Sequence, residues 1–593
     1  MVRPIALSLS LLSGIVILAG AAPGNPSKVP AGPKATAAAP AKASAPAADA
    51  AKKTYDKPAP TSKASNPILL SESKLSPAEV AAKADKILQD EILAGSKTSP
   101  AGKCDDETFL RRVTLDLVGG IPTPEELTKF ILDNSPTKRA AVVEQLLAKE
   151  GYGRNWAHYW RDVILARRSE DRALIVAQPL TKYMEEELNK NTPWDVLARS
   201  FITAKGPIAE NGDTAIFMAQ MGNTEDVASE ITRIFMGIQI SCANCHNHPT
   251  DRWQREQFHE LAAFFPRVAV RPTNVDNVRS FEVVGVDRTP MFGGGGGMNR
   301  RPTGEHFMTD LKNPASKGTR MEPVFFATGD KLSPGKTDEE RRKDLAEWMT
   351  SNRDEWFAKA IINRLWSELV GEGFYEPVDD MGPDRGCTAP KTMQLLAQEF
   401  VGHNYDVKWL FRTIMDTAAY QRESRSRRNP AETPFASSTH QQLRADQIYL
   451  SLTKALGMGE PQEAAAGGRP GGFGGMGRNP RGQFGTTFNY DPSTRRDEVS
   501  GSIPQALLMM NSSELARYET GKNSFTALGK LLADTKNDDA VVVELYLRCL
   551  ARVPKDSEIK TCLEHVKKVS SRTEAFEDVL WSLVNSTEFL HRK

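Results

Sequence analysis

The residues with the clearest chemistry are two cysteines and a histidine in the stretch SCANCHNHPTD, residues 241–251. Cys242 and Cys245 have the spacing C-x-x-C, and His246 follows directly. A c-type haem is attached by this arrangement, because the two thiols bond its vinyl groups and the adjacent histidine binds its iron. The motif therefore predicts that Cys242, Cys245 and His246 bind haem c.

The second half of the same stretch allows a different chemistry. His246, His248 and Asp251 offer two imidazoles and a carboxylate, which are ligands for zinc or iron. Cys242 and Cys245 could complete such a site, or they could close a disulfide. Haem attachment has no use for His248 and Asp251, so a metal ion or a disulfide at this place is the open alternative.

An iron ligand on the far face of the haem is harder to choose. His248 lies two residues beyond His246 and cannot reach the opposite face. The sequence offers four candidates: Met218, Met221, His158 and His259. Nothing favours one of them, and a five-coordinate iron is the other alternative.

The N-terminus predicts export. Residues 1–21 contain an arginine, the apolar run IALSLSLLSGIVILAG and small residues at a cleavage position, as signal peptides do. Residues 22–75 are rich in Ala, Pro, Lys and Ser, so we expect a disordered linker. No later stretch has the apolar length of a membrane span. We therefore expect an extracytoplasmic protein, periplasmic, secreted or at the cell surface, with no membrane span in the mature chain.

The charge composition excludes a global attraction to nucleic acid. The 593 residues contain 76 Lys and Arg against 75 Asp and Glu, for a net charge of +1. The expected partner is instead a redox partner protein, and the sequence gives no indication of the oligomeric state.

The elements that would position the motif are mainly helical. Ser76 and Glu79 form a capping box at the start of the first helix. Residues 224–245 have the pattern of an amphipathic helix that runs straight into the motif, and residues 255–265 form the next helix. The β-branched residues of 267–285 predict a small β ribbon.

The expected fold class is mainly α: a multi-helical two-domain protein with a minor β ribbon and long disordered segments. The first helical domain is residues 76–270 and contains the C-x-x-C-H motif. Residues 271–336 form a β-ribbon and Gly-rich connector. The second helical domain is residues 337–593, with a Gly/Arg-rich loop at about 461–485.

A second group of chemical residues is the adjacent pair Asp379 and Asp380. Two neighbouring carboxylates can perform acid–base chemistry or bind Ca²⁺. We favour a structural interpretation, in which Arg364 and Arg385 neutralise them. The sequence has neither a nucleophile elbow nor a dinucleotide-binding fingerprint, so it does not decide whether the protein is an enzyme.

Several long stretches resemble two known families. DDETFLRRVTLDLVGGIPTPEELTKFILD, YGRNWAHYWRDV and ISCANCHNHPTDRWQREQFHELAAFF resemble the cytochrome-like (PSCyt-type) domain of unknown function that is common in planctomycetes. RRKDLAEWMTSNRDEWFAKAIINRLWSELVGEGFYEPVDD resembles the planctomycete (PSD-type) domain of unknown function that usually follows it. Relatives of the first family often read CHDHPFD, where this chain has Asn247 and Thr250.

The resemblance implies that Cys242, Cys245 and His246 are the cytochrome-like motif of the first family, whose biochemical activity is not established. We therefore expect an exported protein that binds one covalent c-type haem and transfers electrons. The alternative is a non-enzymatic binding or scaffolding protein with a Cys/His/Asp metal site or a disulfide at the same motif.

Overall fold

Helices make up most of the chain, which confirms the mainly α prediction. The computed structural model describes residues 67–68, 75–96, 99–275, 278–287, 304–425, 433–459, 480–496 and 498–593. The predicted signal peptide, nearly all of the predicted linker, the Gly-rich part of the connector and residues 461–479 of the predicted loop lie outside the described residues.

In the first half of the chain, the described residues form ten α-helices and four short helices of other types. The α-helices are α1 (Pro77–Leu88), α2 (Asp106–Val118), α3 (Pro124–Leu132), α4 (Lys138–Leu147), α5 (Glu150–Leu165), α6 (Ala177–Asn189), α7 (Trp194–Thr203), α8 (Ala215–Ala219), α9 (Thr224–Met236) and α10 (Arg255–Ala262). The short helices are a π-helix η1 (Gln89–Leu93) and the 3-10 helices η2 (Asp171–Val176), η3 (Gly212–Thr214) and η4 (Ile240–Asn244).

The second half continues with helices of similar length. They are α11 (Asp338–Met349), α12 (Glu355–Val370), α13 (Pro390–Gly402), α14 (Val407–Asp416), α15 (Ala418–Gln421), α16 (Ala445–Leu456), α17 (Pro480–Thr487), α18 (Ile503–Asn511), α19 (Ser513–Glu519), α20 (Ala527–Asp534), α21 (Asp538–Leu550), α22 (Asp556–Lys568), α23 (Arg572–Val584) and α24 (Thr587–Leu590). Among the described residues, no helix is both long enough and apolar enough to cross a membrane.

The strands are short, apart from one hairpin. They are β1 (Gly206–Pro207), β2 (Val268–Val275), β3 (Val278–Gly285), β4 (His306–Met308), β5 (Thr319–Met321), β6 (Val324–Phe325), β7 (Asp330–Lys331), β8 (Ser424–Arg425), β9 (Ser438–Thr439), β10 (Gln441–Gln442) and β11 (His591–Arg592). β2 and β3 pair antiparallel from Val268 opposite Gly285, and β1 joins the other edge of β3. This three-stranded sheet contains the predicted β ribbon.

Two local predictions can be compared directly with the structure. The side chain of Ser76 accepts from the backbone N–H of Glu79, whose carboxylate accepts in return, so the capping box is confirmed. The Gly/Arg-rich loop, in contrast, ends earlier than predicted, because α17 begins at Pro480. Phe484 on α17 is buried and its ring lies 5.5 Å from that of Tyr449, which explains why this part is helical.

The hydrophobic core contains side chains from both predicted domains. One cluster of buried side chains includes Trp156 on α5, Phe357 on α12 and Leu410 on α14. A second cluster joins α16 to the C-terminal helices, and it includes Leu115 of α2. Residues 61–593 accordingly form one compact unit. The boundaries proposed from the sequence stay predictions.

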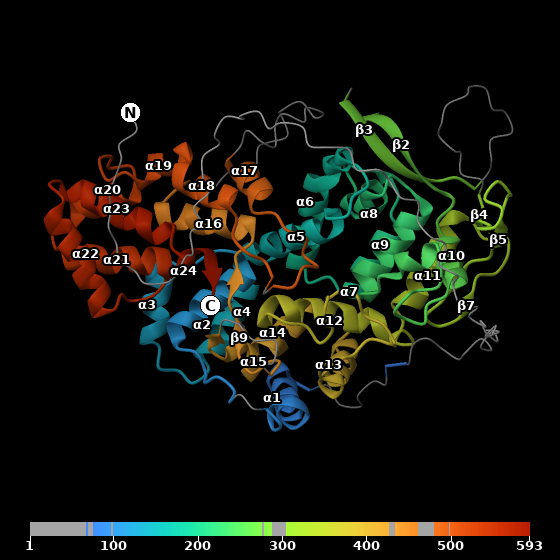
Figure 1. The fold of residues 1–593 in the computed structure, drawn as a ribbon, viewed down its shortest axis with the longest axis horizontal. Helices are drawn as coiled ribbons and strands as arrows, with labels where there is room; N and C mark the ends of the chain where they lie inside the picture. Colours follow the sequence, from blue (N-terminus) through green and yellow to red (C-terminus); the bar gives the residue numbers. More distant parts are fainter. Residues whose placement is uncertain are drawn as a thin grey trace, which may run out of the picture. The chain divides into compact units, whose positions relative to one another are not determined.

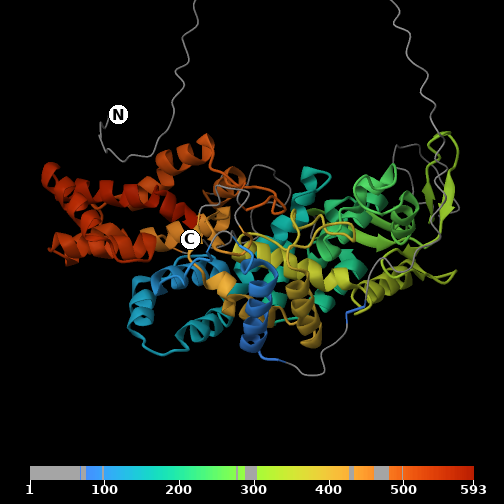
Figure 2. The ribbon, with the colours of Figure 1, turned by 60° about the horizontal axis from the view of Figure 1, so that its bottom comes forward.

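The last residues of the chain complete the packing of α2. The guanidinium of Arg592 donates to both oxygens of Asp116, at 2.7 and 2.8 Å, and both side chains are almost fully buried. Arg112 donates to the backbone carbonyl of Lys593 at 2.8 Å. Figures 1 and 2 both show the red C-terminal helices beside the blue α2 and α3.

Candidate functional site

The helix that precedes the motif ends earlier than the sequence pattern predicts. α9 stops at Met236 because Gly237 adopts a left-handed conformation with φ of +66°, which glycine tolerates. The carbonyl of Gly237 accepts from the backbone N–H of Met381 at 2.7 Å. The prediction of a helix running straight into the motif is therefore wrong, and the motif occupies the 3-10 turn η4 and the loop after it.

The turn η4 and the loop after it present the three motif side chains to solvent. Ile240 and Ala243 are fully buried and anchor η4 in the core. Cys242, Cys245 and His246 lie between and beyond these anchors and are exposed. Two thiols and one imidazole are therefore accessible together on one turn.

One ring nitrogen of His246 is hydrogen-bonded, and the other is not. Nδ1 lies 2.7 Å from the backbone carbonyl of Asn247, and because a carbonyl only accepts, Nδ1 must carry the hydrogen. Nε2 then holds the lone pair, and it has no hydrogen-bond partner within the described part of the chain. This is the tautomer that metal-binding histidines commonly use, with the second nitrogen tied to a carbonyl.

His248 points inward instead. Its Nε2 donates to the carbonyl of Gln239 at 3.3 Å, and its Nδ1 accepts from the backbone N–H of Thr250 at 3.4 Å. Its backbone N–H donates to the carbonyl of Trp253 at 2.8 Å. Both ring nitrogens are therefore used to hold the loop.

Asp251 contacts the segment that follows Asp380. Its side chain is 2% exposed, and Oδ2 lies 3.9 Å from Nε of Arg385. Burial raises the pKa of this carboxyl. The carboxylate lies against the backbone of Gly382, where a Cβ atom would come within 1.9 Å of Oδ2. The structure thus does not bring the predicted metal ligands His246, His248 and Asp251 together, and no three His, Cys, Asp or Glu side chains of the described residues form a group suited to a metal ion.

The motif loop rests on the segment that contains Asp379 and Asp380. Asp379 is fully buried and accepts from Gln239 at 2.9 Å, from Arg233 at 3.3 Å and from Arg167 at 3.4 Å. Burial acts to raise the pKa of Asp379, but the guanidinium groups of Arg364 and Arg233 outweigh it and hold the pKa below its usual value.

Asp380 is paired as the sequence suggests. Its carboxylate accepts from Arg385 at 2.8 Å, and the same guanidinium donates to Thr250 of the motif loop at 2.8 Å. The structural interpretation of the two aspartates is confirmed, although the direct partners of Asp379 are Arg233 and Arg167 rather than Arg364. Sequence reasoning missed these contacts because the partners are more than 140 positions apart.

The candidate distal iron ligands are either packed in the core or hydrogen-bonded to other groups. Met218 is fully buried in the main core, and Met221 packs against the same core. His259 donates from Nε2 to the carbonyl of Asn244 at 3.1 Å and accepts at Nδ1 from His306 at 2.8 Å. Both ring nitrogens of His158 face guanidinium groups. His306 was not predicted, and no sequence signal points to it.

A polar cavity of about 220 Å³ lies next to the first residue of the motif. Its wall includes Arg167, Asp226, Glu230, Arg233, Gln239 and Ser241. Arg233 and Glu230 form a buried ion pair of 2.6 Å in this wall. Such a charged lining does not fit the apolar faces of a porphyrin, so it offers no pocket for haem.

All six cysteines lie among the described residues, and none is in a disulfide in this structure. Cys242 and Cys245 are exposed, whereas Cys104 and Cys549 are buried. In this structure the two cysteines of the motif are not bonded to each other.

Two family models match the chain. The model of PSCyt2, a protein of unknown function, matches residues 83–270, and the model of PSD1, also a protein of unknown function, matches residues 341–469. The chain therefore belongs to the proteins that carry a PSCyt2 domain followed by a PSD1 domain, as its sequence motifs suggest. Both domains are of the planctomycete type and have no established function. Neither a curated protein nor a solved structure matches the chain.

Proposed function

We propose that this protein carries one haem c, bonded through the thiols of Cys242 and Cys245 with Nε2 of His246 as an iron ligand. The observation that carries the proposal is the hydrogen bond from Nδ1 of the exposed His246 to the Asn247 carbonyl, which in the neutral ring leaves the lone pair on Nε2. The exposure of both thiols supports it as well, because thioether formation needs access to the two sulfurs.

Among the candidate iron ligands, His246 is exposed, while His158, His259 and Met218 are engaged elsewhere. A haem on the two exposed thiols would therefore be held by the motif loop, with His246 as its iron ligand. A bound haem would supply a one-electron couple, and its place on an exposed loop suits exchange of an electron with a redox partner protein. The proposed location is extracytoplasmic, where such a group is attached.

The test is to produce the full chain in a bacterial periplasm together with the haem-attachment machinery. We expect a pyridine haemochrome spectrum from the denatured chain, because thioether bonds survive unfolding. Replacing both cysteines, Cys242→Ala with Cys245→Ala, should abolish this signal. Cys387→Ala is the matched control, since Cys387 is only partly exposed and lies outside the motif.

Absence of covalent haem on the denatured native chain would overturn the proposal. Elemental analysis of the same sample then separates the alternatives. Zinc or iron without porphyrin would indicate a metal site at the motif, and a metal-free chain with oxidised Cys242 and Cys245 would indicate a disulfide in a binding or scaffolding protein.

A further inference from the structure

We propose that the outer face of α18 is a contact surface for a second copy of this chain, so that the protein forms a two-fold symmetric dimer. Ile503, Leu507 and Met510 of this helix are 77%, 54% and 51% exposed. They lie at positions i, i+4 and i+7, so they form one apolar stripe along the helix. Exposed apolar side chains that are scattered singly need no explanation, whereas a contiguous set of them marks an interaction surface.

The opposite face of α18 is fixed to the body of the protein. Leu508 and Met509 are buried in the second core cluster, which also contains Phe484 of α17. The side-chain amide of Gln505 donates to the carbonyl of Thr487 at 3.2 Å. These contacts set the rotation of the helix about its axis, and they leave the apolar stripe facing outward.

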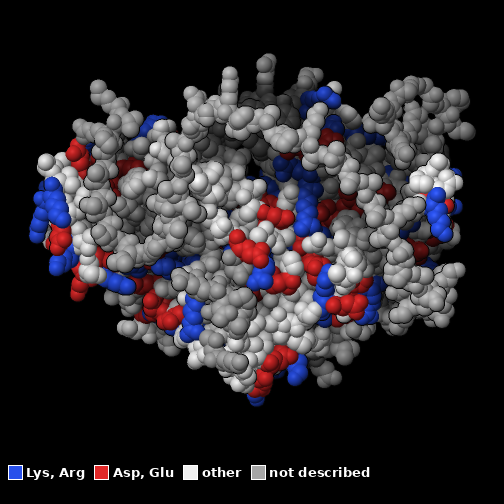
Figure 3. All heavy atoms as spheres, in the orientation of Figure 1, with Lys and Arg blue, Asp and Glu red and all other residues white. Residues whose placement is uncertain are grey.

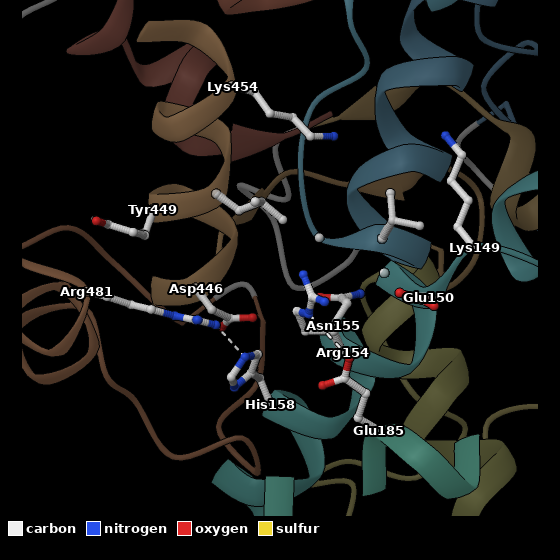
Figure 4. A pocket seen from close by; sticks show the side chains of 14 residues that line it. Lys149, Glu150, Arg154, Asn155, His158, Glu185, Asp446, Tyr449, Lys454 and Arg481 are labelled. Carbon is white, nitrogen blue, oxygen red and sulfur yellow. Dashed lines mark hydrogen bonds and ion pairs between the residues drawn. The ribbon is translucent and has the colours of Figure 1, made fainter. Parts of the chain in front are cut away.

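The neighbouring helix α17 is anchored in turn. The ring of Phe484 packs against Tyr449 of α16, and Arg481 contacts Nε2 of His158 on α5 (Figure 4). The stripe is therefore part of a surface that is connected to α5 and α16. A face that is already ordered can bind a partner with little further loss of conformational freedom.

The charge of the molecule favours a second copy as the partner. The chain has a net charge of +1, and Figure 3 shows Lys and Arg interspersed with Asp and Glu on the face that it displays. Two copies therefore repel each other only weakly. Residues 499–513 contain no charged side chain, so two stripes can meet without burying an unpaired charge.

The segments on either side of α18 present opposite charges. Glu498 precedes the helix and is the more exposed member of its ion pair with Arg495, whereas Arg517 follows the helix and is more exposed than its partner Glu514. Both pairs are loose, with 3.7 Å between the charged atoms. A two-fold axis perpendicular to the stripe makes the two helices antiparallel, which brings Glu498 of each copy toward Arg517 of the other. It also places the two helix dipoles in opposite directions.

The composition and the size of the stripe define the kind of contact. Helices that lie on a lipid surface carry Lys and Arg beside their apolar face, and α18 carries neither. The three exposed side chains cover less than the roughly 800 Å² that each partner buries in a stable complex. We therefore expect a weak dimer with a dissociation constant of about 1–100 µM.

The proposed dimer leaves the C-x-x-C-H motif accessible. Figure 1 shows α18 among the C-terminal helices and apart from α9 and α10, which precede and follow the motif loop. Each copy would thus keep its own exposed motif, and the dimer does not depend on a bound haem.

Analytical ultracentrifugation of the full chain, exported to a bacterial periplasm and free of haem, tests the dimer. Between about 1 and 100 µM, we expect the sedimenting species to change from monomer toward dimer. Leu507→Gln combined with Met510→Gln should weaken the dimer about tenfold or more, because it removes the centre of the apolar contact. Both side chains are exposed, so the fold is retained, which circular dichroism verifies. Leu311→Gln is the matched control, since Leu311 is 59% exposed and lies between β4 and β5.

Charge reversal tests the antiparallel arrangement. Glu498→Arg and Arg517→Glu each bring like charges together and should each weaken the dimer about threefold, whereas the two changes combined should restore it. A combined variant that is no stronger than either single variant would overturn the antiparallel pairing.

Three results would overturn the proposal as a whole. The first is a chain that stays monomeric over the full concentration range. The second is an equal effect of Leu311→Gln and of the double variant at Leu507 and Met510. The third is co-sedimentation of the chain with phosphatidylglycerol vesicles that the double variant abolishes, because the stripe would then bind lipid instead of a second copy.

Discussion

The side-chain amide of Gln239 donates a hydrogen bond of 2.9 Å to the buried carboxylate of Asp379. The backbone carbonyl of Gln239 accepts from His248 in the motif loop. A residue directly before the C-x-x-C-H turn thus connects that turn to a segment 140 positions later. The second half of the chain thus supports the loop that carries the exposed motif.

The first prediction concerns the buried carboxylate. Asp379→Asn should lower the free energy of unfolding by about 3 kcal/mol, because Arg233 and Arg167 lose a buried counter-charge. Asp380→Asn is the matched control and should cost less than about 1 kcal/mol, since its partner Arg385 is partly exposed. Urea denaturation followed by circular dichroism measures both, and equal losses would contradict the role given to Asp379.

The second prediction concerns the close contact between Gly382 and Asp251. Gly382→Ala places a Cβ atom within 1.9 Å of Oδ2 of Asp251, so the motif loop must shift. We expect a loss of about 1–3 kcal/mol in urea denaturation. Gly386→Ala in the same segment meets no atom within 4 Å and should leave the stability nearly unchanged. If both alanine variants have the same free energy of unfolding, the contact between Gly382 and Asp251 does not stabilise the loop.

The third prediction is a difference in thiol reactivity in the native protein before any haem is attached. Cys242 and Cys245 are exposed and should react with iodoacetamide first. Cys549 is buried, and burial raises the pKa of its thiol to about 12, so it should react only after unfolding. Peptide mass spectrometry over a time course gives the order of alkylation. Protection of Cys242 in reduced, haem-free protein would contradict the exposed turn.

The fourth prediction is a loss of stability in mild acid that depends on His259 and His306. Burial lowers the pKa of both side chains from 6.5 to about 4, and for His259 the neighbouring His306 contributes as well. The unfolded chain therefore binds more protons than the folded chain between these values. The stability that these two histidines contribute is complete above about pH 6.5 and is lost as the pH falls toward 4.

Each of these histidines should contribute a slope of about 1.4 kcal/mol per pH unit within that window. His306→Gln removes one of these two titrating groups, so the slope of unfolding free energy against pH should decrease by about 1.4 kcal/mol per pH unit within that window. Urea denaturation at a series of pH values measures the slope. If the variant has the same slope as the native protein, the titration of His259 and His306 does not cause the loss of stability in acid.

The sequence predicts those features of the fold that depend on near neighbours. The capping box of Ser76 and Glu79, the β ribbon and the pairing of Asp380 with Arg385 all join residues that lie close together in the chain. The end of α9 was missed although Gly237 is a recognised stop signal, because the apolar pattern continues beyond it.

The support of the motif could not be predicted from the sequence. Asp379 meets Arg233, 146 positions away, and Asp251 meets the backbone of Gly382. Tertiary packing decides such contacts, and the residue types alone allow many partners. For the same reason the sequence grouped His246, His248 and Asp251, whereas in the structure each of them has different hydrogen-bond partners.

The ion pair of Asp116 with Arg592 joins residues 476 positions apart. The segment matched by PSCyt2 contains the aspartate and ends long before the arginine. Cut out at the family boundaries, that segment would retain a buried carboxylate without its guanidinium. During synthesis a further 476 residues must be made after the aspartate before its arginine partner emerges. The family boundaries therefore mark stretches of related sequence rather than pieces that can be excised and expected to fold alone.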